Sequence, residues 1–128
     1  MRHPDWATRL PNTLRAVMSR PFSWGEHDCC LFTADCVIAV CDFNPCLEIR
    51  GRYHSKAGAL RVLSNKFGDL QQGVSRFFNT VPVQQAGHGD VVMFDGDEGL
   101  ILGVLWTNKI WAVTNIGARP VDKIPIMA

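Results

Sequence analysis

The chain has 128 residues, of which 47% are hydrophobic and 20% charged, so it suffices for one globular domain and is too short for two ordinary ones. Its formal net charge of +1 gives no electrostatic reason to expect nucleic acid or an anionic membrane as a partner. No apolar run approaches the roughly 20 residues that span a bilayer, and the first residues lack the apolar core of a signal peptide. We therefore expect one domain over residues 1–128, made and kept in a cytoplasm without membrane insertion.

A first helix is predicted before Arg20. Its apolar residues recur every four positions, which is typical of one helical face: Trp6, Leu10, Leu14 and Met18. Pro11 interrupts this pattern, and proline both lacks a backbone N–H and clashes with the preceding turn. The sequence therefore predicts a kink or two short helices in this region.

A buried helix is predicted over Cys29–Cys41, after the sequence PFSWGEHD. Asp28 is a natural N-cap, because its carboxylate can accept hydrogen bonds from the free N–H groups of the first turn. Only Thr33 and Asp35 are polar within the helix. Since a helix that is apolar on nearly every side must be covered on most of its surface, this one is predicted to be the central element.

Cys29 occupies the first position of that helix, where the partial positive charge of the N-terminus lowers a thiol pKa and makes the sulfur more nucleophilic. Gly25 allows a sharp approach to the helix, and Trp24 can form one wall of a site. The alternative is equally open, because free cysteine is among the most buried residue types and is often only a small hydrophobe. This second interpretation is preferred for Cys30, Cys36 and Cys41.

The five cysteines form one cluster between residues 29 and 46. A disulfide framework would spread them along the chain, so reduced thiols are predicted. The cluster has no C-x2-C pair, and helical geometry puts those cysteines that share a face two or three turns apart. We expect no metal site and no other cofactor.

The segment LEIRGRYH at residues 47–54 is predicted to be an irregular loop. Arg50 and Arg52 in it can hold a carboxylate or phosphate, or can be solvated residues that cap a helix end. Ser55 is predicted to start a helix that runs through Lys66, and Asp69 is predicted to cap a further short helix. The apolar residues expected to face the core are Ala59, Leu60, Leu63 and Phe67, then Leu70, Val74, Phe77 and Phe78.

From Thr80 the pattern changes to short apolar runs. Val81–Val83 is interpreted as an edge piece, because proline does not fit a sheet interior. The predicted strands are Val91–Phe94, Leu100–Trp106, Ile110–Thr114 and Val121–Ile126. Their links DGDEG, TNK and NIGARP have turn chemistry and favour an antiparallel meander. Helices followed by strands predict an α+β fold, with the cysteine-bearing helix packed on a sheet of about 4–5 strands.

The segment FSWGEHDC at residues 22–29 resembles the signature of the NlpC-type cell-wall cysteine peptidases, and GDVVMF at 89–94 resembles the first strand of their sheet. The segments PF at 21–22, ADCV at 34–37, RGRY at 50–53 and GDVV at 89–92 are similar to those of small bacteriophage and prophage tail-assembly proteins related to that family. The resemblance covers roughly residues 20 to 105. It implies a papain-like, NlpC-type fold with Cys29 in the nucleophile position.

The sequence departs from this family at the histidine that opens the second strand and pairs with the cysteine in active enzymes. The aligned position is Ile101, and no histidine follows His88. A thiolate without a general base loses proton transfer, which typically contributes about 10²–10⁴-fold. His88 is expected at the wrong end of the sheet, so His54 is the first candidate for a substitute base.

The resemblance and the missing histidine together predict a tail-tip or tail-assembly structural protein that keeps a peptidase fold and is not an active enzyme. The alternative is a peptidoglycan-cleaving cysteine endopeptidase that assists phage entry, with Trp24, Gly25 and Asp28 lining the site. A cysteine acyl-transfer or thiol-redox protein is a third and weaker interpretation. The expected partners are other phage tail proteins and, for the enzyme, peptidoglycan. The expected location is the host cytoplasm during assembly and then the virion tail.

Trp106 and Trp111 flank the predicted TNK turn. Paired tryptophans at a hairpin tip can belong to a core, but they are also residues that docking surfaces use. We expect this hairpin to touch a partner protein.

Overall fold

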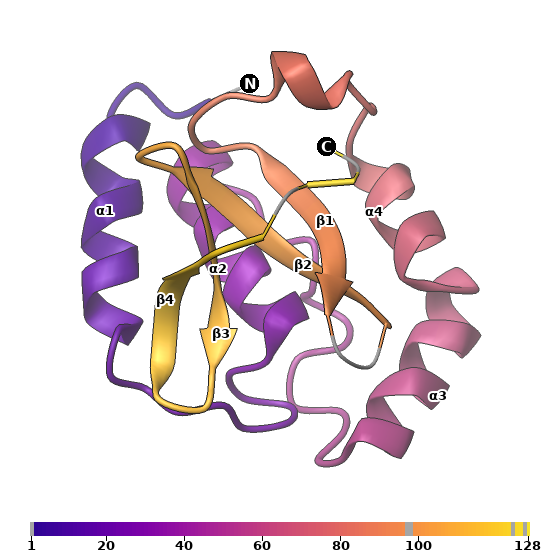
Figure 1. Cartoon of the computed structure of the whole chain (residues 1–128). Helices are drawn as coiled ribbons and strands as arrows, with labels where there is room; N and C mark the ends of the chain where they lie inside the picture. The colour runs from indigo at the N-terminus through magenta and orange to yellow at the C-terminus, as the bar shows by residue number, and fades with distance from the viewer. Residues whose placement is uncertain (1, 97–98, 124, 127) are drawn as a thin grey trace.

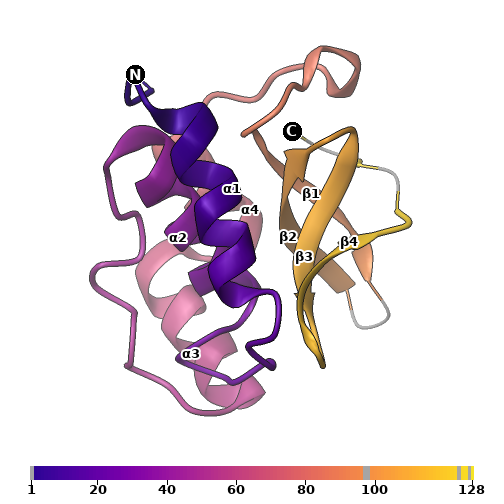
Figure 2. The same cartoon turned by 90° about the vertical axis from the view of Figure 1, so that its left-hand side faces the viewer.

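The computed structural model of the chain describes residues 2–96, 99–123, 125–126 and 128. In chain order its elements are α1 (Trp6–Val17), α2 (Cys29–Cys41), α3 (Lys56–Phe67), α4 (Leu70–Phe77), the 3-10 helix η1 (Val83–Gln85), β1 (Val91–Gly96), β2 (Gly99–Trp106), β3 (Lys109–Thr114) and β4 (Gly117–Val121). The four α-helices of these described residues lie on one face of the sheet (Figure 2). The predicted α+β class, with helices first and an antiparallel sheet second, is confirmed.

The sheet is a meander with the strand order β1-β2-β3-β4, and every pair of neighbours is antiparallel. Thr107 and Asn108 link β2 to β3, with φ values of 54° and 63°. Two consecutive left-handed residues give a turn whose twist matches that of the strands it joins. The predicted meander is therefore confirmed, and its β2–β3 turn is built from the expected turn sequence.

The last strand differs from its prediction. β4 covers Gly117–Val121, so most of the segment interpreted as a turn is in the sheet, and the predicted strand Val121–Ile126 was wrong. Pro120 is tolerated because β4 is an edge strand. The backbone N–H of Ile126 instead donates to the carbonyl oxygen of Met93 at 2.9 Å, beside β1. Residue 124 of the predicted strand, and residues 97–98 of the DGDEG turn, lie outside the described residues.

Helix α1 is one uninterrupted helix that contains Pro11, so the predicted alternative of two short helices was wrong. Leu10, Leu14 and Val17 are buried against α2 and the sheet. Proline removes one hydrogen bond from the helix, whereas a break would displace this apolar face from its partners. Packing therefore decides the conformation here against the local preference.

Helix α2 is the central element, as predicted. It contacts α1 as well as β2 and β3 of the sheet, and Figure 1 shows it in the middle of the fold. Leu31, Phe32 and Ala34 are all 0% exposed. Although α2 is almost wholly apolar, neither it nor another helix of the described residues has the length and hydropathy to cross a membrane.

Helices α3 and α4 begin at the predicted caps: the Ser55 hydroxyl accepts from Gly58 N–H, and the Asp69 carboxylate accepts from Gln72 N–H. The pair lies along the edge of the molecule opposite α1 (Figure 1). Two predicted core residues are consequently exposed, Leu60 by 58% and Phe77 by 37%.

The segment after α4 also differs from its prediction. The residues Val81–Val83 were expected to form an edge piece of the sheet, but the chain turns at Pro82 into the 3-10 helix Val83–Gln85. Because Pro82 provides no N–H for a strand ladder, a turn satisfies this backbone better than a sheet edge does.

Candidate functional site

Cys29 is placed at the start of α2 by a tight turn over residues 23–27. The backbones of Ser23 and His27 pair across this turn, with N···O distances of 3.0 and 2.8 Å. Gly25 within it has φ of +83°, and a β-carbon there would collide with the carbonyl oxygen of Tyr53. Only glycine satisfies both the left-handed backbone and the close approach, so Gly25 sets how the turn packs on residues 50–53.

Asp28 caps α2 as predicted, and it also binds two further groups. Its carboxylate is 1% exposed and accepts from Leu31 N–H at 3.0 Å, from Gly25 N–H at 3.0 Å and from the Tyr53 hydroxyl at 2.6 Å. The three donors come from the helix, the preceding turn and the loop after α2. Asp28 therefore joins three segments of backbone at one buried carboxylate.

Tyr53 is a site residue that the sequence reasoning did not assign. It is 5% exposed, and burial, followed by its hydrogen bond to Asp28, raises the pKa of its phenol well above the ordinary value. A second connection runs from Gly51 N–H to the carbonyl oxygen of Gly25 at 3.2 Å. The RGRY motif was the only feature of the sequence that drew attention to this loop. Its contact with the turn before Cys29 could be seen only in the tertiary structure.

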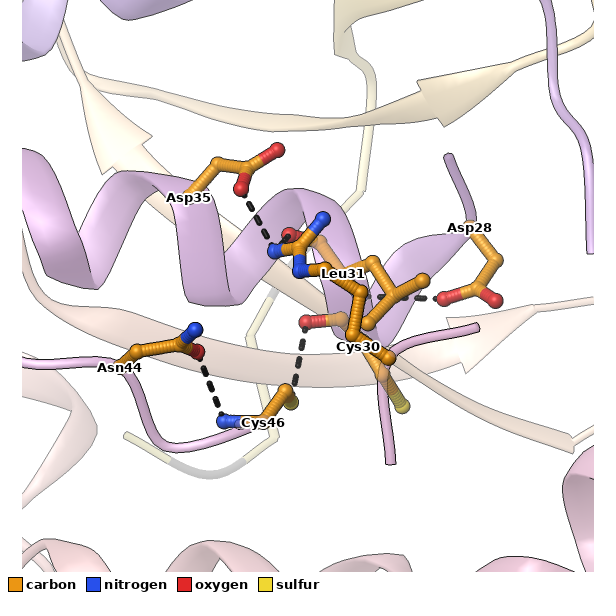
Figure 3. A network of polar contacts seen from close by, with 7 residues as sticks. Asp28, Cys30, Leu31, Asp35, Asn44 and Cys46 are labelled. Carbon is orange, nitrogen blue, oxygen red and sulfur yellow. Dashed lines mark hydrogen bonds and ion pairs between the residues drawn. The ribbon is translucent and has the colours of Figure 1, made fainter. Parts of the chain in front are cut away.

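Arg50 holds the same loop against the middle of α2. Its guanidinium lies 2.7 Å from the Asp35 carboxylate and 3.5 Å from the Leu31 carbonyl oxygen. Figure 3 shows Asp28, Leu31 and Asp35 along one helix, with Asn44 and Cys46 on the segment beside it. Arg50 therefore pairs with a carboxylate of its own chain, and binding of another carboxylate or phosphate by Arg50 and Arg52 stays a prediction.

The Cys29 side chain is half-buried and lies where α2 meets β2. The pKa of its thiol is lowered, first by a hydrogen bond from the Cys30 side chain and further by the backbone N–H groups of Leu102 and Cys30. Burial and the charge of Asp28 act in the opposite direction. The sulfur is therefore favoured as an anion by fixed donors.

The neighbouring cysteines have the opposite character. Burial raises the pKa of the Cys36 and Cys46 thiols, and the hydrogen bond to Cys29 together with burial raises that of Cys30. The Cys46 thiol lies 3.8 Å from the Cys30 carbonyl oxygen, a contact drawn in Figure 3. Within the described part of the chain, no three His, Cys, Asp or Glu side chains are grouped so that they could hold a metal ion.

These differences predict selective alkylation. With the native protein at neutral pH, iodoacetamide is expected to modify Cys29 at least about tenfold faster than Cys30 or Cys36, because only Cys29 combines partial exposure with a lowered pKa. Peptide mass spectrometry over a time course measures the two rates, and Cys29→Ala is the control. Equal rates for Cys29 and the buried Cys36 would contradict this electrostatic description.

The two faces of β2 decide which residue meets Cys29. Leu102 packs with Cys29 on the helical side of the sheet, whereas Ile101 packs on the opposite side with Phe94. Because side chains alternate along a strand, Ile101, the position aligned with the family histidine, points away from α2 and from Cys29. Leu100 shares the face of Leu102, and neither residue is a histidine.

The remaining histidines are distributed around the fold. The His88 ring lies 5.3 Å from the Trp106 ring at the C-terminal end of β2, four residues beyond Leu102, so its predicted position away from the site is confirmed. His3 accepts a backbone hydrogen bond near the N-terminus. His54 is exposed, and its Nδ1 lies 3.6 Å from the place where a β-carbon on Gly25 would be. Among the described residues, no hydrogen bond joins a histidine to Cys29.

His27 is 0% exposed, and neither of its ring nitrogens has a hydrogen-bond partner among the described residues. Burial, followed by the charge of Arg20, lowers its pKa below the ordinary 6.5. The unfolded chain therefore binds this proton more readily, so stability present above pH 6.5 is lost as the pH falls toward the folded-state pKa.

We accordingly expect the free energy of unfolding to decrease as the pH falls below about 6.5, and His27→Gln to flatten that decrease. Urea denaturation at several pH values measures it. His54→Gln is the matched control, because it replaces a histidine that is exposed on the surface. A pH profile unchanged by His27→Gln would show that another group is responsible.

The three tryptophans named from the sequence have internal contacts. Trp24 packs edge-to-face on Phe22, with ring centroids 4.7 Å apart. Trp106 and Trp111 are partly buried and pack against the cluster that α1, α2 and the sheet share. All three tryptophans therefore contribute to packing within the fold. A role of the β2–β3 hairpin in partner binding stays a prediction.

Two pockets lie along α2, and neither is lined by Cys29. One, of about 230 Å³, lies between α2, α4 and β1 and is lined by Val40 and Cys41 at the far end of the helix. The other, of about 50 Å³, reaches Cys30 and Leu102 and is almost wholly apolar. The site at Cys29 is thus a half-buried thiol supported by backbone donors.

No curated protein and no solved structure matches the chain. A family profile does match it, over residues 1–126, which is nearly the full length. The chain belongs to this family, which is described as a domain of unknown function, DUF6950.

Proposed function

We propose that the protein is a structural component of a bacteriophage tail tip, with a papain-like, NlpC-type framework and no peptidase activity. It is made in the host cytoplasm and joins other tail proteins in the virion. The proposal is supported by the resemblance of four short segments to small tail-assembly proteins and by the chemistry around Cys29. The α+β order of its elements agrees with such a framework without distinguishing it from other α+β folds.

The observation that carries this proposal is the absence of an imidazole partner for the Cys29 sulfur among the described residues. Leu102 and Cys30 are the neighbours that most affect its pKa. A lowered pKa favours the thiolate form of Cys29, but amide cleavage also needs a proton for the leaving amine. A thiolate without an acid–base partner is therefore a poor peptidase site.

The motif residues have a structural use that needs no catalysis. Gly25, Asp28 and Tyr53 hold the start of α2, and Arg50 fastens the same loop to Asp35. These residues fix the packing of the central helix, whether or not Cys29 reacts with a substrate.

The test uses the phage that encodes the protein. Virions carrying Cys29→Ala are expected to assemble and infect at wild-type titre, and the purified protein is expected to release no new amino groups from peptidoglycan fragments. Normal particles that no longer infect with Cys29→Ala, together with thiol-dependent cleavage of the fragments, would contradict the proposal and favour an enzyme.

The second candidate is the peptidoglycan-cleaving endopeptidase, and it is favoured by the place of His54. Its imidazole lies beside Gly25, four residues before Cys29, and is exposed. A change of rotamer or of the loop on substrate binding would be needed to bring it to the sulfur. Under this hypothesis His54→Ala abolishes cleavage of peptidoglycan fragments, whereas His88→Ala, at the far end of β2, leaves it unchanged.

A further inference from the structure

An exposed aromatic surface lies on the α3–α4 side of the molecule, away from the tryptophan hairpin. Phe43, just after α2, and Phe77, at the end of α4, are 41% and 37% exposed, and their ring centroids are 5.5 Å apart. Phe67 lies 6.0 Å from Phe77 in an edge-to-face arrangement. We call these three rings the phenylalanine surface. Large aromatic side chains that remain exposed beside one another are typical of interaction sites.

The phenylalanine surface borders the small apolar pocket of about 50 Å³. Phe67 and Phe77 line this pocket together with Leu63 and Pro45. Since Phe77 is itself exposed, the pocket reaches the surface of the molecule. It has room for the tip of one aliphatic side chain, which is the geometry of an anchor site at an interface.

A more open groove adjoins this pocket. Leu47 lines the groove and is the next residue after Cys46, which lines the pocket. Lys66 also lines the groove and is the residue before Phe67, which lines the pocket. Leu47 is 76% exposed, and Arg52 also lines the groove. An extended or helical segment seated in the pocket would therefore pass over basic side chains.

Positively charged residues outnumber negatively charged ones in the segment that forms most of this surface. Residues 47–77 contain six Lys and Arg but two Asp and Glu, whereas the rest of the chain contains seven and ten. Both carboxylates of the segment are engaged: Glu48 with Lys66 at 3.5 Å, and Asp69 at the start of α4.

Arg76 supplies a cation at the phenylalanine surface itself. Its guanidinium lies 5.3 Å from the centre of the Phe67 ring. Among the described residues, Arg52, Arg61 and Arg76 have no carboxylate partner within their own chain. Such cations attract a partner of opposite charge.

We propose that the phenylalanine surface docks an acidic segment of another protein, with an aliphatic side chain of that segment seated in the apolar pocket. Carboxylates of the partner then face Arg52 and Arg76. The chemistry follows from the combination of an apolar anchor pocket with unpaired cations around it. This inference is independent of whether Cys29 takes part in catalysis.

The test is fluorescence anisotropy with labelled peptides that have a Leu-Leu centre flanked by Glu and Asp. These are expected to bind at least about tenfold tighter than peptides with the same centre flanked by Lys, or with a Ser-Ser centre in acidic flanks. Raising the salt concentration to about 0.5 M is expected to weaken binding.

Phe77→Ser and Arg76→Glu are each expected to weaken this binding at least about tenfold. Ile116→Ser is the matched control, because Ile116 is 62% exposed but lies between β3 and β4. Thermal melting establishes that each variant is folded, including Arg76→Glu, which also removes the contact of the guanidinium with the Phe67 ring.

Three results would overturn the proposal. The first is no preference for the acidic Leu-Leu peptides, or binding that both variants leave unchanged. The second is equally tight binding of a poly-dT oligonucleotide that Arg76→Glu abolishes, which would assign the cations to nucleic acid. The third is a wild-type dimer in sedimentation analysis that Phe77→Ser dissociates while the peptides fail to bind, which would make a second copy the occupant.

Discussion

Replacing Asp28 with alanine is expected to lower the free energy of unfolding by about 3–5 kcal/mol. The substitution removes the cap of α2 and leaves three donors without their acceptor, in Gly25, Leu31 and Tyr53. Water cannot readily replace that acceptor, because Asp28 is 1% exposed. Urea denaturation of the purified variant measures the loss.

Asp69→Ala is the matched control for this prediction. Asp69 also caps a helix through its carboxylate, at 2.8 Å from the Gln72 nitrogen, but it is exposed. Its removal is expected to cost about 1 kcal/mol, the usual worth of an exposed cap. Similar losses for Asp28→Ala and Asp69→Ala would mean that Asp28 is an ordinary cap and does not join three segments.

Phe32→Ala is expected to cost about 3–5 kcal/mol as well, by a different mechanism. Phe32 is 0% exposed and belongs to the core cluster that α1, α2 and the sheet share. The His27 ring lies edge-to-face against it, with centroids 6.1 Å apart. Removing the ring would leave a cavity that rigid elements on every side cannot close. Urea denaturation measures this loss also.

Leu60→Ala is the control for the core substitution. Leu60 is 58% exposed on α3, so its removal is expected to change the free energy of unfolding by no more than about 0.5 kcal/mol. A loss below about 1 kcal/mol for Phe32→Ala would indicate that the core repacks around the missing ring and is less rigid than its burial implies.

The candidate site could be predicted in part from local chemistry. Asp28 followed by Cys29 specified a capped helix start, because a cap acts over three residues of the same segment. The roles of Gly25 and Tyr53 could not be predicted from neighbouring residues. The contact that explains each of them joins the turn before α2 to the loop after α2.

The errors in the prediction have a common physical origin. The local effect of proline allowed two short helices around Pro11, but the burial of Leu10 and Leu14 keeps α1 in one helix. Alignment with the family motif put the position of the catalytic histidine at Ile101, but the Ile101 side chain lies on the face of β2 that points away from α2. In both cases, contacts between distant segments outweigh a preference read from neighbouring residues.

The sequence by itself determined where helices α2, α3 and α4 begin, that the strands follow the helices, and that a cysteine stands at a helix start. These features depend on side chains within a few residues of one another. Only the tertiary structure decided which face of β2 meets Cys29, that no imidazole among the described residues accompanies it, and that a phenylalanine surface stays exposed. These depend on how separate elements pack, because burial is a property of the assembled layers and not of any one segment.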